Sequence, residues 1–360
     1  MRYREYGQTG KMVSLLSFGG MRFADIDDRD ECVGMMVTAA EGGINYFDTA
    51  PGYCDGKSEA VLGAGFAELR RRNLPFYSAT KTFASDGDAI RREIDAQLKR
   101  MDVPAVDFYH IWSVCTLENW RERRKNGILQ TFAKLREEGL IRHVCVSSHL
   151  INNEIGELLM EGVFEGVLFG YSAYNFRARQ SAFDAIRGKK LGAVVMNPLG
   201  GGVIPRNGDL FAALCRPGET AAAAALRFLW DHPDVTSTLV GFDNAEQIRD
   251  ALAAMESYEP RTGAELEALK SGALAAFDGI CTGCAYCDDC PEGIPVPKFM
   301  DVYNQKILHG GDGGDSIANR LKWHWRLDRS LAAECTACGH CEDLCTQHIE
   351  IIKRLQEIAG

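Results

Sequence analysis

The feature that most constrains the fold of this chain is a repeat of alternating elements through its first 260 residues. Short apolar runs rich in β-branched residues are separated by amphipathic stretches with helical spacing. The apolar runs predict strands at 14–18, 46–49, 76–80, 107–112, 143–147, 167–171, 193–197 and 237–240. The stretches between them predict helices at 28–42, 57–71, 86–101, 127–138, 151–160, 178–190, 218–230 and 244–257. Strands that are apolar on both faces and separated by helices are typical of a parallel sheet buried on both sides.

Eight such units predict an α/β fold, as a closed (β/α)8 TIM barrel rather than an open doubly wound sheet. Before them, residues 3–13 include Gly7 and Gly10 and predict a hairpin that closes the bottom of the barrel. The barrel domain is expected to span 1–260, because Glu259-Pro260 stops its last helix. Thr262 and Glu265 have the spacing of a capping box, which predicts a linker helix within 261–280.

The C-terminal part, 281–360, contains two runs of cysteines. The first reads CTGCAYCDDCP from Cys281 to Pro291, and the second reads CTACGHCEDLC from Cys335 to Cys345. Three thiolates at successive x2 intervals, completed by a more distant fourth, are typical of cubane iron–sulfur clusters. A zinc site is the alternative, although zinc usually takes two cysteines from each of two separate knuckles. Disulfides are disfavoured, because cysteines three apart in a compact turn are poorly placed to bridge.

The spacing therefore predicts two [4Fe–4S] clusters in a small, mostly α-helical ferredoxin-like domain. In two-cluster ferredoxins the fourth cysteine of each run ligates the other cluster. That pattern predicts one cluster on Cys281, Cys284, Cys287 and Cys345, and a second on Cys335, Cys338, Cys341 and Cys290. Thr346 stands where a second proline is expected. Helices are predicted at 297–309 and 315–332, around a flexible glycine-rich stretch at 310–314.

Composition excludes some classes of partner. The net charge of −10 and the pI near 5.4 argue against a nucleic-acid ligand, which requires a basic surface. No apolar run reaches the length of a membrane span, and the first residues lack the apolar segment of a signal peptide. Five further cysteines lie scattered through the barrel region. Unpaired thiols beside oxidation-sensitive clusters predict a reducing cytoplasm, such as that of an anaerobe.

Polar residues follow the ends of neighbouring predicted strands, where barrels of this class carry their catalytic groups. Asp48 ends the second strand, Tyr53 follows five residues later, and Lys81 ends the third. A buried lysine lowers the pKa of a nearby tyrosine, and an aspartate keeps that lysine charged and oriented. Such a tyrosine can donate a proton to a carbonyl oxygen as hydride reaches the carbon. Taken singly, each residue also has an ordinary structural explanation.

Together the segments GINYFDTAPGY, GKSE, ATK, GLIRHVCVSSH, NPLGGG and LVGF make the first 260 residues resemble the aldo/keto reductase superfamily. With the cysteine runs, the chain is similar to bacterial aldo/keto reductases that carry a C-terminal ferredoxin-like extension. The resemblance implies hydride transfer from NAD(P)H by an Asp, Tyr, Lys and His tetrad, the first three carried by Asp48, Tyr53 and Lys81.

The fourth member of the tetrad departs from the family pattern. In DFYHIW the position that matches the family histidine is Trp112, and His110 lies two residues earlier. His110 is a candidate catalytic residue or a hydrogen-bonded histidine inside the barrel. Trp112 is a candidate substrate-binding wall, since an indole only donates a hydrogen bond. Relatives that reduce an activated C=C bond have also lost this histidine, so its loss weakens simple carbonyl reduction as the default.

The resemblance also implies a nucleotide site. The residues expected to contact NADP or NAD are Gly20, Met21, Ser147, Ser148, Pro198, Leu199, Gly200, Gly241, Asp243 and Gln247. Asp243 stands where NADP-preferring relatives often have a basic residue, and an acid there would repel a 2′-phosphate. Arg249 could compensate for that charge.

These features predict an iron–sulfur oxidoreductase that acts on a small carbonyl, hydroxyl or activated C=C compound. The alternative is an electron-transfer subunit whose barrel binds a ligand or docks a partner. Nicotinamide moves two electrons and a cubane cluster moves one, which leaves three roles for the clusters: they pass single electrons to a bound substrate, they exchange electrons with a ferredoxin or flavoprotein partner, or they only support the rim of the barrel.

Overall fold

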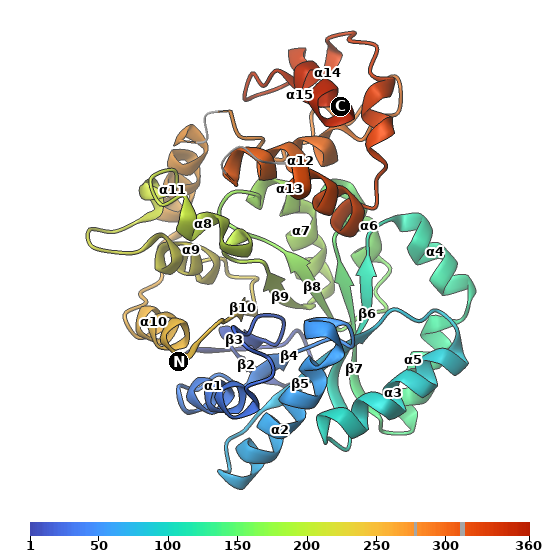
Figure 1. Cartoon of the computed structure of the whole chain (residues 1–360), viewed down its shortest axis with the longest axis vertical. Coiled ribbons are helices and arrows are strands. Elements are labelled where there is room, and N and C mark those ends of the chain that lie inside the picture. Colours follow the sequence, from blue (N-terminus) through green and yellow to red (C-terminus); the bar gives the residue numbers. More distant parts are fainter. Residues whose placement is uncertain (277–278, 310–313) are drawn as a thin grey trace.

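The computed structural model describes residues 1–276, 279–309 and 314–360. Its N-terminal part is a closed barrel of eight parallel strands in the order β10-β3-β4-β5-β6-β7-β8-β9 (Figure 1). The strands are β3 Leu16–Gly19, β4 Tyr46–Asp48, β5 Tyr77–Thr82, β6 Val106–Val114, β7 Ile141–Ser148, β8 Gly166–Gly170, β9 Gly192–Met196 and β10 Ser237–Gly241. Each overlaps one predicted strand, so the (β/α)8 prediction is confirmed.

The predicted hairpin is present, but it takes residues that the sequence assigned to the first barrel strand. Strand β1 (Tyr3–Glu5) pairs antiparallel with β2 (Met12–Ser14), and a bend at Leu15 separates β2 from β3. The prediction of a single strand at 14–18 was wrong because two short apolar strands in succession read as one run.

The hairpin closes the barrel by inserting the ring of Tyr6 into its lower end. A Cβ at Gly166 or Gly192 would lie 2.1 or 2.2 Å from atoms of this side chain. Only glycines at the starts of β8 and β9 therefore leave room for the ring. Tyr6 is fully buried and packs with Tyr46 and Phe108 inside the barrel.

The barrel helices surround the strands. They are α1 Arg29–Glu41, α2 Ser58–Arg71, α3 Gly87–Met101, α4 Leu117–Lys125, α5 Ile128–Glu137, α6 Asn152–Met160, α7 Gln180–Lys189, α8 Val203–Arg206, α9 Ala221–Trp230 and α10 Ala245–Glu256. All eight predicted helices are found. The sequence missed α4, whose residues include six charged side chains in LENWRERRK and which buries only Trp120 and Arg123.

The linker helix α11 (Gly263–Ala276) begins with the predicted capping box. The Thr262 amide donates to Glu265 Oε2 at 2.7 Å, and the Glu265 amide donates to Thr262 Oγ1 at 3.3 Å. The prediction that this helix extends to about residue 279 falls partly on 277–278, which lie outside the described residues.

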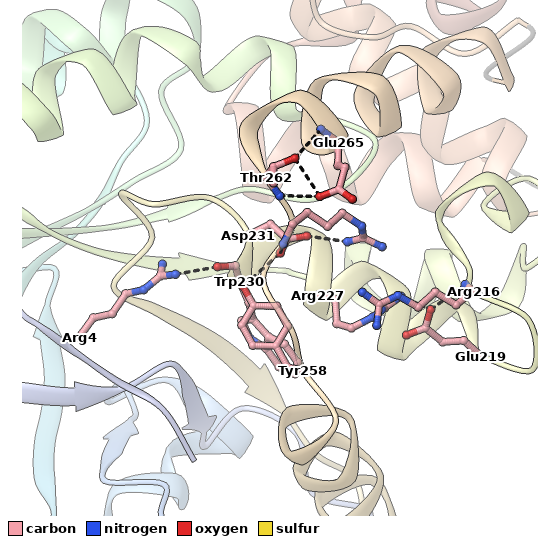
Figure 2. A network of polar contacts seen from close by, with 10 residues as sticks. Arg4, Arg216, Glu219, Arg227, Trp230, Asp231, Tyr258, Thr262 and Glu265 are labelled. Atoms are coloured by element: carbon pink, nitrogen blue, oxygen red, sulfur yellow. Dashed lines mark hydrogen bonds and ion pairs between the residues drawn. The ribbon is translucent and has the colours of Figure 1, made fainter.

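A buried carboxylate fixes the chain just before this helix (Figure 2). Asp231, at the end of α9, accepts hydrogen bonds from the Tyr258 hydroxyl at 3.1 Å and the Arg261 amide at 3.0 Å. Its second oxygen pairs with the Arg261 guanidinium at 2.5 Å, and the Asp231 side chain is completely buried. The linker is therefore attached to the barrel wall by hydrogen bonds and an ion pair.

The C-terminal part is helical and lies over the ends of β6, β7 and β8 (Figure 1). It contains α12 Val296–Leu308, α13 Gly314–Asn319, α14 His340–Asp343 and α15 Ile351–Ala359. The predicted helix at 315–332 is divided into α13, a π-helical turn Arg320–Trp325 and a 3-10 turn Arg329–Glu334. The left-handed conformation of Arg326 ends the π turn. Within the predicted flexible stretch, 310–313 lie outside the described residues.

Removing the buried anchor should destabilise the protein. We expect Asp231→Ala to lower the free energy of unfolding by about 3 kcal/mol, because it leaves Arg261 and Tyr258 without their buried partner. Thr262→Ala removes only the cap and should cost about 1 kcal/mol. Urea denaturation followed by circular dichroism measures both, and equal effects of the two substitutions would contradict the anchoring role.

Candidate active site

The centre of the candidate site is a buried ion pair between neighbouring strands. Strands β4 and β5 pair with Asp48 opposite Ala79, which brings the ends of both strands to the same level. Lys81 Nζ lies 2.5 Å from Asp48 Oδ1 and donates to the Thr49 carbonyl at 2.6 Å. Burial raises the pKa of Asp48 and the charge of Lys81 lowers it again. Burial also lowers the pKa of Lys81, but Asp48 and Tyr53 more than offset this effect, so the lysine stays charged.

Tyr53 lies over this lysine, in the 3-10 turn Tyr53–Gly56 that follows β4. Lys81 Nζ is 4.9 Å from the centre of the phenol ring. Lys81 lowers the pKa of the phenol, as the sequence predicted, but burial has the larger effect and the net pKa is raised. Tyr53 is therefore protonated at neutral pH.

The turn that carries Tyr53 has an unusual backbone. Cys54 and Asp55 adopt left-handed conformations with φ of 51° and 54°. The Cys54 thiol donates to the carbonyl of Met21 at 3.5 Å, and Ser58 Oγ donates to that of Gly20 at 2.6 Å. These contacts tie the Tyr53 loop to the predicted cofactor residues Gly20 and Met21.

Two residues of α2 that the sequence analysis did not select support the ion pair. Ser58 Oγ lies 2.7 Å from Thr49 Oγ1. Glu59 is fully buried and accepts hydrogen bonds from Thr80 Oγ1 at 2.7 Å and Gln97 Nε2 at 2.9 Å. Gln97 also donates to the Lys81 carbonyl at 2.8 Å. The segment GKSE contains both residues, but their partners lie on other elements and the sequence does not show them.

His110 lies inside the barrel beside the lysine. It pairs with Lys81 in the β5–β6 register and is fully buried. Its Nδ1 is 3.4 Å from the Thr80 carbonyl, while Nε2 has no partner in the part of the chain that the structure describes. Burial, followed by the charge of Lys81, lowers the pKa of His110 to about 3. The imidazole is therefore neutral and can donate one hydrogen bond.

Trp112 lies within a β-bulge near the end of β6. The β6–β7 register shifts between Ile111 and Val114, and Ser113 has a φ of 57°. The Trp112 ring meets Tyr53 edge-on with 5.6 Å between centroids, and stacks on Phe83 at 3.9 Å. Phe83 is 45% exposed and was not selected from the sequence. Trp112 and Phe83 form an aromatic wall beside the Tyr53 phenol.

The expected cofactor residues lie on loops at the same end of the barrel. Ser147 and Ser148 end β7 and are buried, and Ser148 Oγ donates to the Val114 carbonyl at 3.1 Å. Pro198 and Leu199 lead from β9 into the turn Gly200–Gly202, whose three glycines all have positive φ. Backbone with this conformation and no side chains can approach a pyrophosphate closely.

The loop after β10 has its own helix-capping geometry. Asn244 caps α10 by accepting from the Gln247 amide at 3.1 Å, and the Asp243 amide donates to Gln247 Oε1 at 3.0 Å. Asp243 and Gln247 are exposed. The helix dipole favours an acidic side chain at a helix N-terminus. The presence of an acid at position 243 can therefore be explained by helix stability alone, without any preference for one nucleotide. Gly241 lies beneath Arg22, whose Cγ would be 2.7 Å from a Cβ at that position.

The eight cysteines of the C-terminal part fall into two groups that cross the two runs. Four of them line one cavity, together with Val296 and Leu355: Cys290, Cys335, Cys338 and Cys341. We call these the outer quartet. The inner quartet is Cys281, Cys284, Cys287 and Cys345. Burial raises the pKa of the Cys281 thiol to about 12, and the charges of Cys284 and Cys345 add to this rise.

The surroundings of the inner quartet fit a thiolate cluster. The Gly283 amide donates to Cys281 Sγ at 3.4 Å, and the Ile349 amide donates to Cys345 Sγ at 3.4 Å. Thr346, in place of the expected proline, donates to Cys284 Sγ at 3.7 Å. Among the described residues, no group of three or more His, Cys, Asp or Glu converges as for a single metal ion. The thiols and amides that are present match the donor set of an iron–sulfur cluster.

A closed (β/α)8 barrel with a buried lysine–aspartate pair beneath a phenol at its mouth defines a class of barrel oxidoreductases. The model of the aldo/keto reductase family matches residues 15–270, and the chain belongs to that family. It is an oxidoreductase of aldo/keto reductase type. The match ends before the first cysteine run.

Several relatives cover the barrel. The uncharacterized oxidoreductase YrpG of Bacillus subtilis is 26% identical over an alignment of 305 positions, which covers 71% of this chain and 91% of YrpG. L-galactose dehydrogenase of Arabidopsis thaliana is 24% identical over 71% of this chain and 88% of its own. NADH-specific methylglyoxal reductase of Escherichia coli is 26% identical over 63% of this chain and 83% of its own.

A solved structure shows the same fold. Aldo-keto reductase AKR11C1 from Bacillus halodurans, in its holo form, superposes with a TM-score of 0.66 at 23% identity. The superposition covers 76% of this chain and 96% of that one. Within the part of the chain that the structure describes, no helix has both the length and the apolar character to cross a bilayer.

The neutral state of His110 predicts a pH dependence of stability. Because its pKa is lowered to about 3, the unfolded chain binds a proton that the folded protein excludes. Stability is therefore lost as the pH falls from the unfolded pKa near 6.5 towards 3. Between pH 7 and pH 4.5, we expect the free energy of unfolding of His110→Asn to fall by about 2–3 kcal/mol less than that of wild type. Thermal melting between pH 7 and pH 4.5 measures this loss of stability. The control is His348→Asn, because His348 is exposed. If the stability of wild type and of His110→Asn fell equally with pH, His110 would not be neutral in the folded protein.

Proposed function

We propose that this protein reduces a carbonyl or an activated C=C bond in a small substrate, with Tyr53 as the proton donor. The observation that carries the proposal is the buried Lys81–Asp48 pair directly beneath a protonated phenol. When the phenol gives up its proton, Lys81 stabilises the phenolate because the two groups are close and shielded from water. Asp48 keeps Lys81 charged through the cycle.

Neighbouring residues define how a substrate would lie. Neutral His110 directs its Nδ1–H to the Thr80 carbonyl, so its other nitrogen, Nε2, is an acceptor that could receive a hydrogen bond from a substrate hydroxyl or a water. Trp112 and Phe83 form the flat side of the site and keep water from the phenol. A planar, conjugated substrate fits this wall better than a branched aliphatic one.

The proposed hydride donor is NADH or NADPH, and the aldo/keto reductase family supports this choice. Gly20, Met21, Ser147, Ser148, Pro198, Leu199, Gly200, Gly241, Asp243 and Gln247 would hold it. Asp243 favours NADH over NADPH, because an exposed carboxylate repels a 2′-phosphate.

The proposed C-terminal domain is ferredoxin-like, with [4Fe–4S] clusters on the inner and outer quartets. Such clusters would supply one-electron transfer. The inner quartet lies against the barrel: Gly283 contacts Ala178, and Arg177 donates to Thr282 Oγ1 at 3.3 Å. The outer quartet includes the exposed Cys338. This arrangement favours a ferredoxin or a flavoprotein as the partner that exchanges electrons at the outer quartet.

The role of Tyr53 is tested by substitution. We expect Tyr53→Phe to lower kcat by about 1000-fold or more, because no other described hydroxyl lies over Lys81. NADH oxidation with methylglyoxal or with a panel of conjugated enones, and NAD⁺ reduction with L-galactose, provide the assays. Tyr3→Phe, on the exposed hairpin, is the control. If Tyr53→Phe turned over substrate at the native rate, Tyr53 would not be the proton donor.

Iron analysis tests the two quartets. Anaerobically purified protein should contain about eight irons per chain. We expect Cys284→Ala and Cys345→Ala to lose the same electron paramagnetic resonance signal, and Cys338→Ala and Cys290→Ala to lose the other. Cys215→Ala, outside both quartets, should retain all the iron. Zinc in place of iron would refute the clusters. If all substitutions within one cysteine run removed the same signal, the assignment of each cluster to cysteines of both runs would be wrong.

A further inference from the structure

A group of buried polar side chains joins the barrel to the C-terminal part. His149 follows β7, Tyr174 and Arg179 lie on the loop after β8, Asp301 and Gln305 lie on α12, and Arg320 and His324 lie on the π turn. We call these seven residues the interface cluster. Tyr174 and Arg179 are buried to 4% and 2% exposure, and His149 and His324 meet edge-on with 4.3 Å between ring centres.

The interface cluster has more positive than negative charge. Arg320 forms a two-point ion pair with Asp301, at 2.8 Å and 3.2 Å. Asp301 also accepts from Trp325 Nε1 at 2.8 Å. Arg179 donates through Nη1 to the carbonyls of His149 and Leu150, which neutralise no charge. The one carboxylate therefore pairs with Arg320, and Arg179 has no ion-pair partner among the described residues.

The histidines do not compensate for this excess. Burial, then Arg320 and Arg179, lower the pKa of His149 to about 3, and the pKa of His324 lies well below its usual value. Both rings are therefore neutral. An uncompensated buried charge is costly, so a site of this kind favours binding of an anion.

Several polar atoms of the cluster have no hydrogen-bond partner among the described residues. They are His149 Nδ1, Arg179 Nε, Gln305 Nε2 and His324 Nε2. Arg179, Gln305 and His324 are at least nine-tenths buried. Guanidinium, amide and imidazole N–H groups are the donors that bind phosphate and carboxylate oxygens.

The interface cluster adjoins the candidate active site on two sides. His149 directly follows Ser147 and Ser148, and the Tyr174 ring would be 2.9 Å from a Cβ at Gly200. On the other side, Arg123 donates to the Trp112 carbonyl at 2.7 Å, and Arg326 lies near both Arg123 and His149. The excess charge is therefore at the mouth of the barrel, between the expected nicotinamide and pyrophosphate contacts.

We propose that Arg179 and Arg320 form an anion-binding site, completed by the C-terminal part, for a phosphate or carboxylate group of the substrate or dinucleotide. This inference depends on the proposed function in one respect: both place the reaction at the mouth of the barrel. Its consequence is that the C-terminal part contributes a ligand-binding residue as well as cysteines.

Anion binding to the full-length protein, purified without oxygen, tests the site. The probes are inorganic phosphate, acetate and ADP-ribose, followed by calorimetry and by the rise in melting temperature. We expect Arg320→Gln to weaken phosphate binding by at least about tenfold. Lys322→Gln removes the same charge from an exposed position on the same turn and should bind like wild type.

A second variant should change phosphate binding in the opposite direction. Asp301→Asn removes the internal carboxylate that competes for both guanidinium groups. It should melt at a lower temperature than wild type without anion, bind phosphate more tightly, and regain its melting temperature in phosphate. A purely structural role for Asp301 predicts the loss of stability without tighter binding or rescue, and that result would overturn the proposal.

The three probes separate the sources of the anion. Loss of ADP-ribose binding in Arg320→Gln identifies the dinucleotide, whereas loss of phosphate or acetate binding with unchanged ADP-ribose binding identifies the substrate. If no probe binds wild type, or all bind Arg320→Gln equally, the site does not exist. Turnover that still depends on Tyr53 would then leave the proposed function standing.

Discussion

The ion pair between Lys81 and Asp48 is the interaction on which the site depends. Both side chains are completely or almost completely buried, so neither charge is stable without the other. Their pairing requires β4 and β5 in register, and Ser58, Glu59 and Gln97 hold the surrounding backbone. The positive charge of Lys81 acts on two neighbours: it stabilises a phenolate at Tyr53, and it adds to the effect of burial that keeps His110 neutral.

The sequence predicted the barrel well because strand periodicity and helix caps are local signals. These local signals predicted the eight strands, the eight helices named from the sequence, the closing hairpin and the Thr262–Glu265 cap. The errors arose where local signals were ambiguous: the bend at Leu15 divides one apolar run, and α4 presents too few apolar residues to be recognised. The segment 315–332 is divided because Arg326 adopts a left-handed conformation that ends the π turn, and because its turns pack on α12 and α15.

The candidate site was predicted in part. Asp48, Tyr53 and Lys81 come together as their places at strand ends indicated, and the crossed grouping of the cysteines agrees with the lining of the outer cavity. The net pKa of Tyr53 could not be predicted, since it depends on burial by residues distant in sequence. The bulge at Ser113 and the interface cluster likewise depend on contacts between β6 and β7, and between α12 and the barrel loops.

The attachment of the linker at Asp231 has a consequence for how the two parts of the chain act together. A short tether fixed at its root gives the C-terminal part a high effective concentration over the strand ends, independent of how much protein is present. Even a weak face-to-face contact is then almost fully occupied. The contact can therefore include buried polar groups, such as those of the interface cluster, without the two parts of the chain separating.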